Sequence, residues 1–176
     1  MAKLEYPLSE VYGLLETGPV LLLTSQAKGR RNVMAQSWHS MIEFDPALVA
    51  CVVSESNYSH ALIVDSGECV LNIPTVDIAG KVAGCGNASG REVDKFAVFQ
   101  LAASPASKVD APLLDECPAS LECRVFDRIP AYELFLLEVV KAWVDPGVRD
   151  PKTLHHRGRG VFMVAGESIS LPSSMK

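Results

Sequence analysis

The chain has 176 residues, 48% of them hydrophobic and 21% charged, which is ordinary for a globular protein. This length predicts a single domain over residues 1–176 with a core that needs no metal or disulfide. A formal net charge of −5 argues against a nucleic-acid-binding surface, which requires clustered Lys and Arg. No apolar run reaches the length of a membrane helix, so we expect no membrane partner.

The cysteines and the N-terminal residues both indicate the cellular compartment of the protein. Five cysteines, an odd number with no CxxC spacing, indicate free thiols in a reducing environment. The first residues lack the charged-then-apolar pattern of a signal peptide. We therefore expect a cytoplasmic protein.

The first half of the chain alternates short predicted strands with helical segments. Leu8, Val11, Tyr12 and Leu15 recur at helical spacing, which predicts a short amphipathic helix that ends before Pro19. A helix is also expected from His60 to the stop signal at Gly67. Strands are predicted over residues 19–25, 31–40, 48–53 and 68–73.

The second half is richer in β pattern. A helical turn is expected from Thr75 to about Ala83, then a loop over residues 84–90 because of its three glycines, then helix over 94–99. Strands are predicted over 120–127, 132–144 and 161–164. Strict βα alternation is missing, which disfavours a doubly wound parallel sheet. The pattern favours a closed or nearly closed antiparallel barrel, mainly β with short helices.

The second predicted strand has the composition of a ligand-binding wall. On one face it would carry Asn32, Met34, Gln36 and Trp38, and on the other the small residues Val33, Ala35 and Ser37. Small side chains let a flat ligand lie close to backbone amides, and Asn and Gln offer it donors and acceptors. This strand is therefore the leading candidate for a binding site.

A hydroxyl-rich turn precedes the helix predicted at His60. The hydroxyls of Ser54, Ser56 and Ser59, with the helix amides near Asn57 and Tyr58, suit a phosphate group. The alternative is that Ser56 or Asn57 only caps the helix, which on sequence alone is the commoner case.

Two further segments suit the same kind of ligand. Asn72, Ile73 and Pro74 end a strand at a turn, where they would edge a planar ring. The segment Ser89, Gly90 and Arg91, followed by Lys95, combines close backbone approach at glycine with positive charge. The basic cluster Lys28-Gly29-Arg30-Arg31 is either a solvated turn or an attractor for a phosphorylated ligand.

Together these blocks resemble the flavin reductase-like, FMN-binding split-barrel family, and within it the flavoredoxins most. The matching blocks are Asn32-Val33-Met34, Ser37-Trp38, Asn72-Ile73-Pro74, Ser89-Gly90-Arg91, Asp94-Lys95-Phe96, Val109-Asp110-Ala111-Pro112 and Leu121-Glu122-Cys123. The resemblance implies an antiparallel FMN-binding split β-barrel, with the strand from Asn32 to Trp38 along the isoalloxazine and the turn from Ser54 to Ser59 at the phosphate. It also implies a homodimer with the flavin near the interface, where Trp38 and the N-terminal helix would lie.

The phosphate turn departs from that family in one respect. Relatives often carry Arg or Lys in this turn, whereas this chain has Glu55 and no base. His60 and Arg91 are the candidates to compensate.

The resemblance implies an oxidoreductase that moves reducing equivalents from NAD(P)H through bound FMN to a small-molecule or protein acceptor. No catalytic side chain is named, because the flavin carries the chemistry. One alternative is a flavin-carrying electron-transfer protein reduced by a protein partner, without nicotinamide nucleotide activity. Another is a barrel without flavin, whose glycines and hydroxyls only make turns and caps. A hydrolase is disfavoured, since no Gly-x-Ser-x-Gly is present.

Three residues keep an open role at this stage. His155 and His156 are adjacent, so in an extended chain they point to opposite sides, and no metal site is expected from them. They more simply belong to a basic loop, with a substrate-side role for His155 as the alternative. Cys85 lies in the predicted pocket loop, where a bystander is favoured over a redox role.

Overall fold

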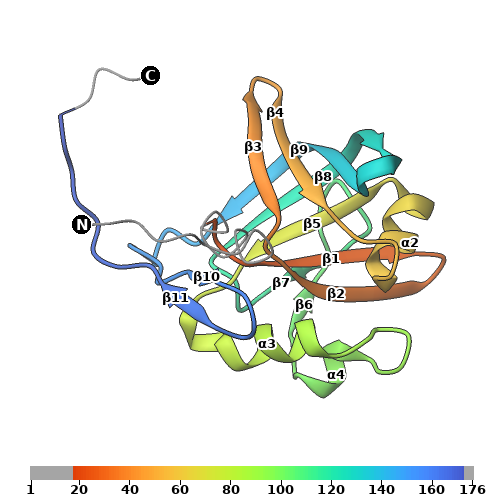
Figure 1. Cartoon of the computed structure of the whole chain (residues 1–176), viewed down its shortest axis with the longest axis horizontal. Helices are drawn as coiled ribbons and strands as arrows, with labels where there is room; N and C mark the ends of the chain where they lie inside the picture. The colour runs from red at the N-terminus through yellow and green to blue at the C-terminus, as the bar shows by residue number, and fades with distance from the viewer. Residues whose placement is uncertain (1–17, 173–176) are drawn as a thin grey trace, which may run out of the picture.

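The computed structural model describes residues 18–172, and its centre is one antiparallel sheet of seven strands that curves into a barrel (Figure 1). The N-terminal helix predicted around Leu8–Leu15 lies outside the described residues. In chain order the strands are β1 (Leu21–Ala27), β2 (Arg30–Gln36), β3 (His39–Phe44), β4 (Ala47–Val52), β5 (Glu68–Ile73), β8 (Ala119–Ile129) and β9 (Leu134–Val144). In space their order is β2-β1-β5-β8-β9-β4-β3, so β2 and β3 are the two end strands.

Gln36 links the end strand β2 to β4, the strand next to the other end of the sheet. Its Nε2 donates to the carbonyl of Val52 at 2.7 Å and to that of Trp38 at 3.1 Å, and its Oε1 accepts from Ser37 N at 3.0 Å. These bonds turn the chain between β2 and β3, so the single strand predicted over residues 31–40 is wrong: it is two strands. The predicted mainly β split barrel is confirmed.

Short helices and small strands decorate the barrel. The helices are α2 (Tyr58–Ser66), η2 (Val76–Ile78), α3 (Ala79–Asn87), α4 (Lys95–Val98) and η3 (Pro130–Tyr132). The small strands are β6 (Ala103–Ser104), β7 (Leu113–Leu114), β10 (Leu154–His156) and β11 (Phe162–Val164). Helix α2 ends at Gly67, whose φ of 74° is the left-handed conformation that its sequence position predicted. Within residues 18–172, no helix is both long enough and apolar enough to cross a membrane.

The prediction of a loop over residues 84–90 is partly wrong, because α3 continues to Asn87. Gly84 costs helix propensity, about 1 kcal/mol relative to Ala. A Cβ at this position would overlap the ring of Phe99, so the glycine lets that ring pack directly on the helix. Tertiary packing thus overrides the local preference.

The alternation of β1 divides the core into two clusters. Leu21 and Leu23 point into the barrel, where they pack with Phe135. Val20 and Leu22 point outward into a second cluster that also holds Val82 of α3 and Phe96 of α4. Burying a side chain of this size contributes about 1.5–3 kcal/mol. The outer cluster therefore fixes α3 and α4 against the β1–β2 face, which positions the site described next.

Candidate functional site

Two adjoining cavities lie beside β2, an end strand of the sheet that pairs with β1 on one edge only. The larger, about 460 Å³, is named here the Phe162 cavity. It is lined by Val20, Ala35, Gln36, Ser37, Val82, Ala83, Gly86, Asn87, His156, Gly160 and Phe162. The smaller, about 240 Å³, is named the Asn32 cavity. It is lined by Asn32, Met34, Ser56, Asn57, Tyr58, Gly86, Asn87, Ala88, Ser89, Gly90 and Lys95. Gly86 and Asn87 are common to both, so the cavities adjoin at the C-terminal end of α3, and together they are called the hollow beside β2.

The two predicted faces of β2 have different surroundings. Asn32 is buried, and its Nδ2 donates to Ser59 Oγ at 2.9 Å. Val33, on the opposite face, is fully buried in the outer core. The prediction that the small face lies open to a ligand is therefore wrong at Val33, whereas Ala35 and Ser37 do line the Phe162 cavity.

Trp38 does not follow the β2 alternation. The chain turns after Gln36, and Trp38 is 55% exposed instead of lining either cavity. The prediction that Trp38 shares a strand face with Asn32, Met34 and Gln36 is therefore wrong.

The hydroxyl-rich turn places only its middle in the Asn32 cavity. Ser56, Asn57 and Tyr58 line it at the N-terminus of α2. Asn57 is the N-cap residue but makes no side-chain cap hydrogen bond within the described chain, which favours the ligand interpretation over simple capping.

The two outer hydroxyls of the turn are used elsewhere. Ser54 Oγ donates to Glu133 Oε1 at 3.0 Å. Ser59 is fully buried, and its hydroxyl accepts from Asn32. Ser56 is the one of the three serines that lines the cavity, and its hydroxyl lies 3.0 Å from Ser54 Oγ.

Arg91 supplies the positive charge that the turn itself lacks. Its Nη1 donates to the carbonyl of Ser56 at 2.7 Å, and its guanidinium lies 5.5 Å from the centre of the Tyr58 ring. His60 instead packs edge-on against Phe135 at 5.3 Å, where burial and the nearby Arg128 lower its pKa. Of the two candidates, only Arg91 is beside the turn as a permanent cation.

Lys95 brings a second cation to the Asn32 cavity. It is 4% exposed, and its Nζ donates to the carbonyl of Cys85 at 2.7 Å. Burial lowers the pKa of Lys95, because a charged ammonium loses hydration there. An ammonium has three donors, so further acceptors from a ligand would satisfy this group.

Cys85 itself does not line either cavity. It is 1% exposed in the outer core, and burial raises the pKa of its thiol to about 11. Since the thiolate is the reactive form, the burial and the raised pKa of this thiol favour the predicted bystander role.

Gly90 allows the chain to pass very close to β2. A Cβ at this position would overlap Asn32 Oδ1 and lie 3.1 Å from Cδ1 of Tyr58. A side chain here would push apart the two walls of the Asn32 cavity. The glycine predicted to permit close approach therefore does so.

Asn72 is in the core and away from both cavities. Its Nδ2 donates to Leu22 O at 2.9 Å, and its Oδ1 accepts from Leu114 N at 3.0 Å and Ser120 Oγ at 2.7 Å. With its amide satisfied and no exposed surface, Asn72 holds β1 and β7 against β5. Neither Ile73 nor Pro74 lines the hollow, so the structure does not bring the predicted ring-edge segment to it.

The C-terminal hairpin closes the Phe162 cavity. The rings of His156 and Phe162 lie 5.1 Å apart, and both line the cavity with Gly160. His155 lies within 3.0 Å of the hydroxyl of Thr153 and is not a lining residue. Sequence reasoning missed Phe162 and the α3 residues Val82 and Ala83, since nothing in their local pattern signals a distant partner on β2.

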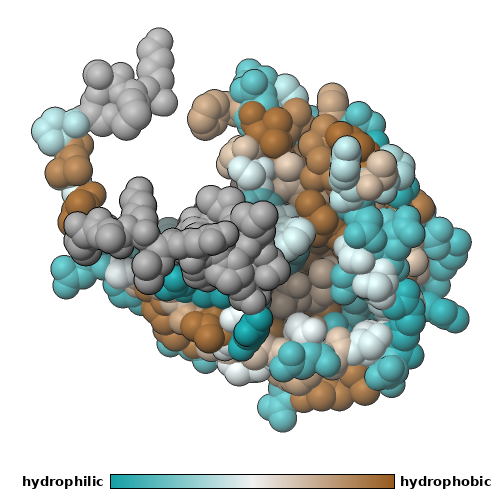
Figure 2. Space-filling model, in the orientation of Figure 1, coloured by the Kyte–Doolittle hydropathy of each residue, from teal (hydrophilic) through white to brown (hydrophobic). Residues whose placement is uncertain are grey.

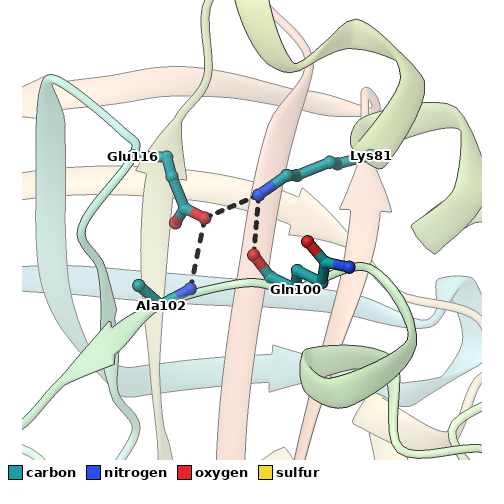
Figure 3. Close-up of polar contacts among 4 residues, drawn as sticks. All are labelled: Lys81, Gln100, Ala102 and Glu116. Carbon is teal, nitrogen blue, oxygen red and sulfur yellow. Dashed lines mark hydrogen bonds and ion pairs between the residues drawn. The ribbon is translucent and has the colours of Figure 1, made fainter.

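An ion pair anchors α3, which forms one wall of both cavities. Lys81 Nζ donates to Glu116 Oε1 at 2.9 Å and to the carbonyl of Gln100 at 2.7 Å, and Ala102 N donates to the same carboxylate (Figure 3). Burial alone would raise the pKa of Glu116, but the hydrogen bonds from Lys81 and Ala102 outweigh it and lower the pKa. The ionised pair therefore stabilises the position of the helix.

Replacing Lys81 by Met is expected to lower the free energy of unfolding by about 1 kcal/mol, because it leaves a partly buried carboxylate short of a donor. This corresponds to a loss of about 2–4 °C in Tm for a domain of this size.

The loss of stability is expected to depend on pH. Because the pKa of Glu116 is lower in the folded state, the stabilisation by its ionised carboxylate is present above the unfolded pKa of about 4.3. This stabilisation is lost as the pH falls through the folded pKa. The measurement is the difference in Tm between the wild type and Lys81→Met, by thermal unfolding at pH 7 and at pH 3. An equal loss of Tm at both values would contradict the ionic role.

The seven-stranded sheet and the short helices around it define the class of protein: an antiparallel split β-barrel. The chain belongs to the flavin reductase-like family, whose domain model matches residues 15–162. It is 35% identical over 173 residues to the uncharacterized protein YddH of Escherichia coli, covering 89% of this chain and 92% of YddH.

Solved structures agree with this assignment. An FMN-binding domain of a flavin reductase-like enzyme from Shewanella baltica is 27% identical, with a TM-score of 0.83 over 95% of this chain and 96% of that one. A flavoredoxin from Methanosarcina acetivorans is 25% identical, with a TM-score of 0.81 over 97% and 95%. A flavin-related fold is therefore established.

Proposed function

We propose that the hollow beside β2 binds FMN and that the protein is an oxidoreductase moving reducing equivalents from NAD(P)H to an acceptor. The observation that carries the proposal is the polarity of the hollow. One end, the Phe162 cavity, is walled by apolar groups such as Val82 and Phe162, and the other adjoins Lys95 and Arg91. A flavin mononucleotide has the same polarity, with a planar ring at one end and a phosphate dianion at the other.

The residues fit the two ends of this ligand. The phosphate would lie at the α2 N-terminus by Ser56 and Tyr58, where helix amides and the Arg91 guanidinium favour negative charge. The rings would lie against Ala35 and Ser37 in the Phe162 cavity. The distance along β2 from Asn32 to Gln36 is about 13 Å at about 3.3 Å per residue, comparable to the length of a mononucleotide.

When bound, FMN would supply the hydride-accepting chemistry, and the protein supplies position and exclusion of water. His156 and Phe162 wall the cavity on the side of the C-terminal hairpin, where they would limit access to the rings. Lys95 would hold positive charge beside the polar groups of the ligand. No side-chain acid or base is required by this arrangement.

The alternative is a flavin carrier that a protein partner reduces. Anaerobic addition of NADH or NADPH to the FMN-loaded protein distinguishes the two. Loss of the flavin absorbance on addition of either nucleotide is expected for the oxidoreductase. Full FMN occupancy without bleaching by either nucleotide would contradict nicotinamide dependence and favour the carrier.

A homodimer is also proposed, with the β3–β4 hairpin at its interface. This hairpin projects from the barrel, and hydrophobic side chains gather over it (Figures 1 and 2). Met41 and Ile42 are more than half exposed and Phe44 is 85% exposed. An apolar patch of this kind marks an association surface. Light scattering is expected to give twice the chain mass, and Phe44→Ser is expected to shift the mass toward a monomer.

A cytoplasmic location is proposed on the state of the cysteines. All five are unpaired, and four of them are buried. Free thiols of this kind are typical of proteins in a reducing compartment.

A further inference from the structure

The chain leaves the barrel after β11 as an extended segment, named here the C-terminal arm (residues 165–172) (Figure 1). The arm is neither helix nor strand, but its base is tied to the preceding loop. Lys152 Nζ donates to the carbonyl of Gly166 at 2.9 Å, and Ser168 Oγ donates to Asp150 Oδ1 at 3.0 Å. These bonds fix the direction in which the arm leaves the barrel.

The outer half of the arm carries apolar side chains that the described chain leaves exposed. Ile169 is 80% exposed and Leu171 is 73% exposed. Because they are two residues apart in an extended segment, they point to the same side, and Ser170 points to the other. A single exposed apolar side chain is ordinary, whereas an apolar row on a projecting segment indicates a docking element.

A second apolar surface is open on β3. This strand ends the sheet, so within residues 18–172 it pairs with β4 on one edge only. Its side chains Met41, Ile42 and Phe44 are between 54% and 85% exposed. An apolar end strand that stays uncovered favours aggregation, so proteins usually cover such an edge.

The described part of one chain does not cover either surface by itself. The arm runs away from the barrel instead of turning back over β3 (Figure 1), and apolar side chains are seen along it (Figure 2). In a two-fold dimer each copy offers one arm and one β3–β4 hairpin. A reciprocal exchange therefore covers both surfaces in both copies, whereas an unrelated partner on one surface would leave the other open.

We infer that the C-terminal arm of one copy lies on the β3–β4 hairpin of a second copy, with Ile169 and Leu171 packed on Met41, Ile42 and Phe44. This inference rests on the proposed homodimer and names the contact that holds it together. Each dimer contains the contact twice, because a two-fold interface uses the same surfaces on both copies.

The exchange also affects the proposed flavin site. His156 of β10 and Phe162 of β11 wall the Phe162 cavity, and the arm continues the chain directly beyond β11. A second copy that holds the arm therefore restrains the β10–β11 hairpin at the cavity. Flavin affinity then depends on the dimer, since restraint of this hairpin before binding lowers the entropy cost of closing the site.

Cross-linking between two different variants tests the contact. Leu171→Cys and Phe44→Cys are prepared separately, mixed to allow exchange of subunits, and treated with a short bifunctional maleimide. A covalent product of two chains is expected from the mixture and not from either variant alone. Each variant mixed with the wild type measures the background from Cys117, the native thiol that is not buried.

The double variant Ile169→Ser, Leu171→Ser gives a second test without new cysteines. The dimer is expected to weaken by at least about a hundredfold, measured by light scattering over a dilution series. FMN affinity is expected to fall by about tenfold in fluorescence titration. Ser170→Ala changes the opposite side of the arm and is the matched control, expected to alter neither quantity. Both substituted positions are exposed, so circular dichroism is expected to show an unchanged fold.

Several results would overturn the inference. A dimeric wild type whose variants give no cross-link above background would show that the arm lies elsewhere, with the homodimer and the flavin site unaffected. A dimer that persists in the double variant would show the same. Loss of the dimer with unchanged FMN affinity would refute the coupling to the flavin site. A monomeric wild type would contradict the proposed homodimer and the inference together, whereas a cross-linked dimer that binds no FMN would contradict only the proposed flavin function.

Discussion

Gly86→Leu is expected to abolish FMN binding while leaving the protein folded. Gly86 lines both cavities, and a Cβ there would lie 3.5 Å from the Cβ of Ala35, so the added side chain would point at the β2 edge where the rings are proposed. Leucine is about 1 kcal/mol more favourable than glycine inside a helix, so the Tm is not expected to fall. A loss of at least about a hundredfold in FMN affinity, near 2.7 kcal/mol, is expected by fluorescence titration.

Gly80→Leu is the matched control on the same helix. A Cβ at Gly80 meets no atom of the described chain within 4 Å, and Gly80 lines neither cavity. This variant is expected to bind FMN as the wild type does. Wild-type affinity in Gly86→Leu, or an equal loss in the two variants, would show that the hollow beside α3 is not the flavin site.

Ser56→Asp is expected to weaken FMN by about ten- to a hundredfold and riboflavin by less than about threefold. The new carboxylate would lie at the proposed phosphate position and repel its charge, whereas riboflavin has no phosphate. Ser56 is exposed, so the variant is expected to fold. Ser59→Asp would be a poorer test, because it would bury a charge at a fully enclosed position.

Ser56→Asn is the uncharged control for this position, and it is expected to change FMN affinity by less than about threefold. Isothermal titration of both ligands against both variants measures the effect. Equal losses of FMN and riboflavin in Ser56→Asp would place the phosphate somewhere other than the α2 N-terminus.

Local pattern predicted much of the barrel. Strand β5 has the bounds that the sequence predicted, from Glu68 to Ile73, because β-branched and apolar residues run between a glycine and a proline. The alternation of Asn32, Met34 and Gln36 against Val33 and Ala35 also holds along β2. What failed were positions decided by distant contacts. The ring of Phe99 on Gly84 keeps α3 helical, and Gln36 ends β2 by bonding to Val52.

The site was predictable in its parts but not in its assembly. Residue type and local spacing were enough to nominate Ser56, Arg91 and Lys95, and the structure brings all three to one region. Asn72 has the same residue type as Asn32, yet its amide is used wholly within the core. Only the fold decides which of two such side chains remains for a ligand. The α3 wall and Phe162 depend on contacts between remote segments, which no local pattern encodes.

The flavin site can be located in a crystal structure after the crystals are soaked with FMN. Electron density for the rings is expected in the Phe162 cavity against Ala35 and Ser37, with the phosphate between Ser56 and Arg91. Density for the flavin at any other surface, or a hollow beside β2 that stays free of flavin at saturating concentration, would contradict it.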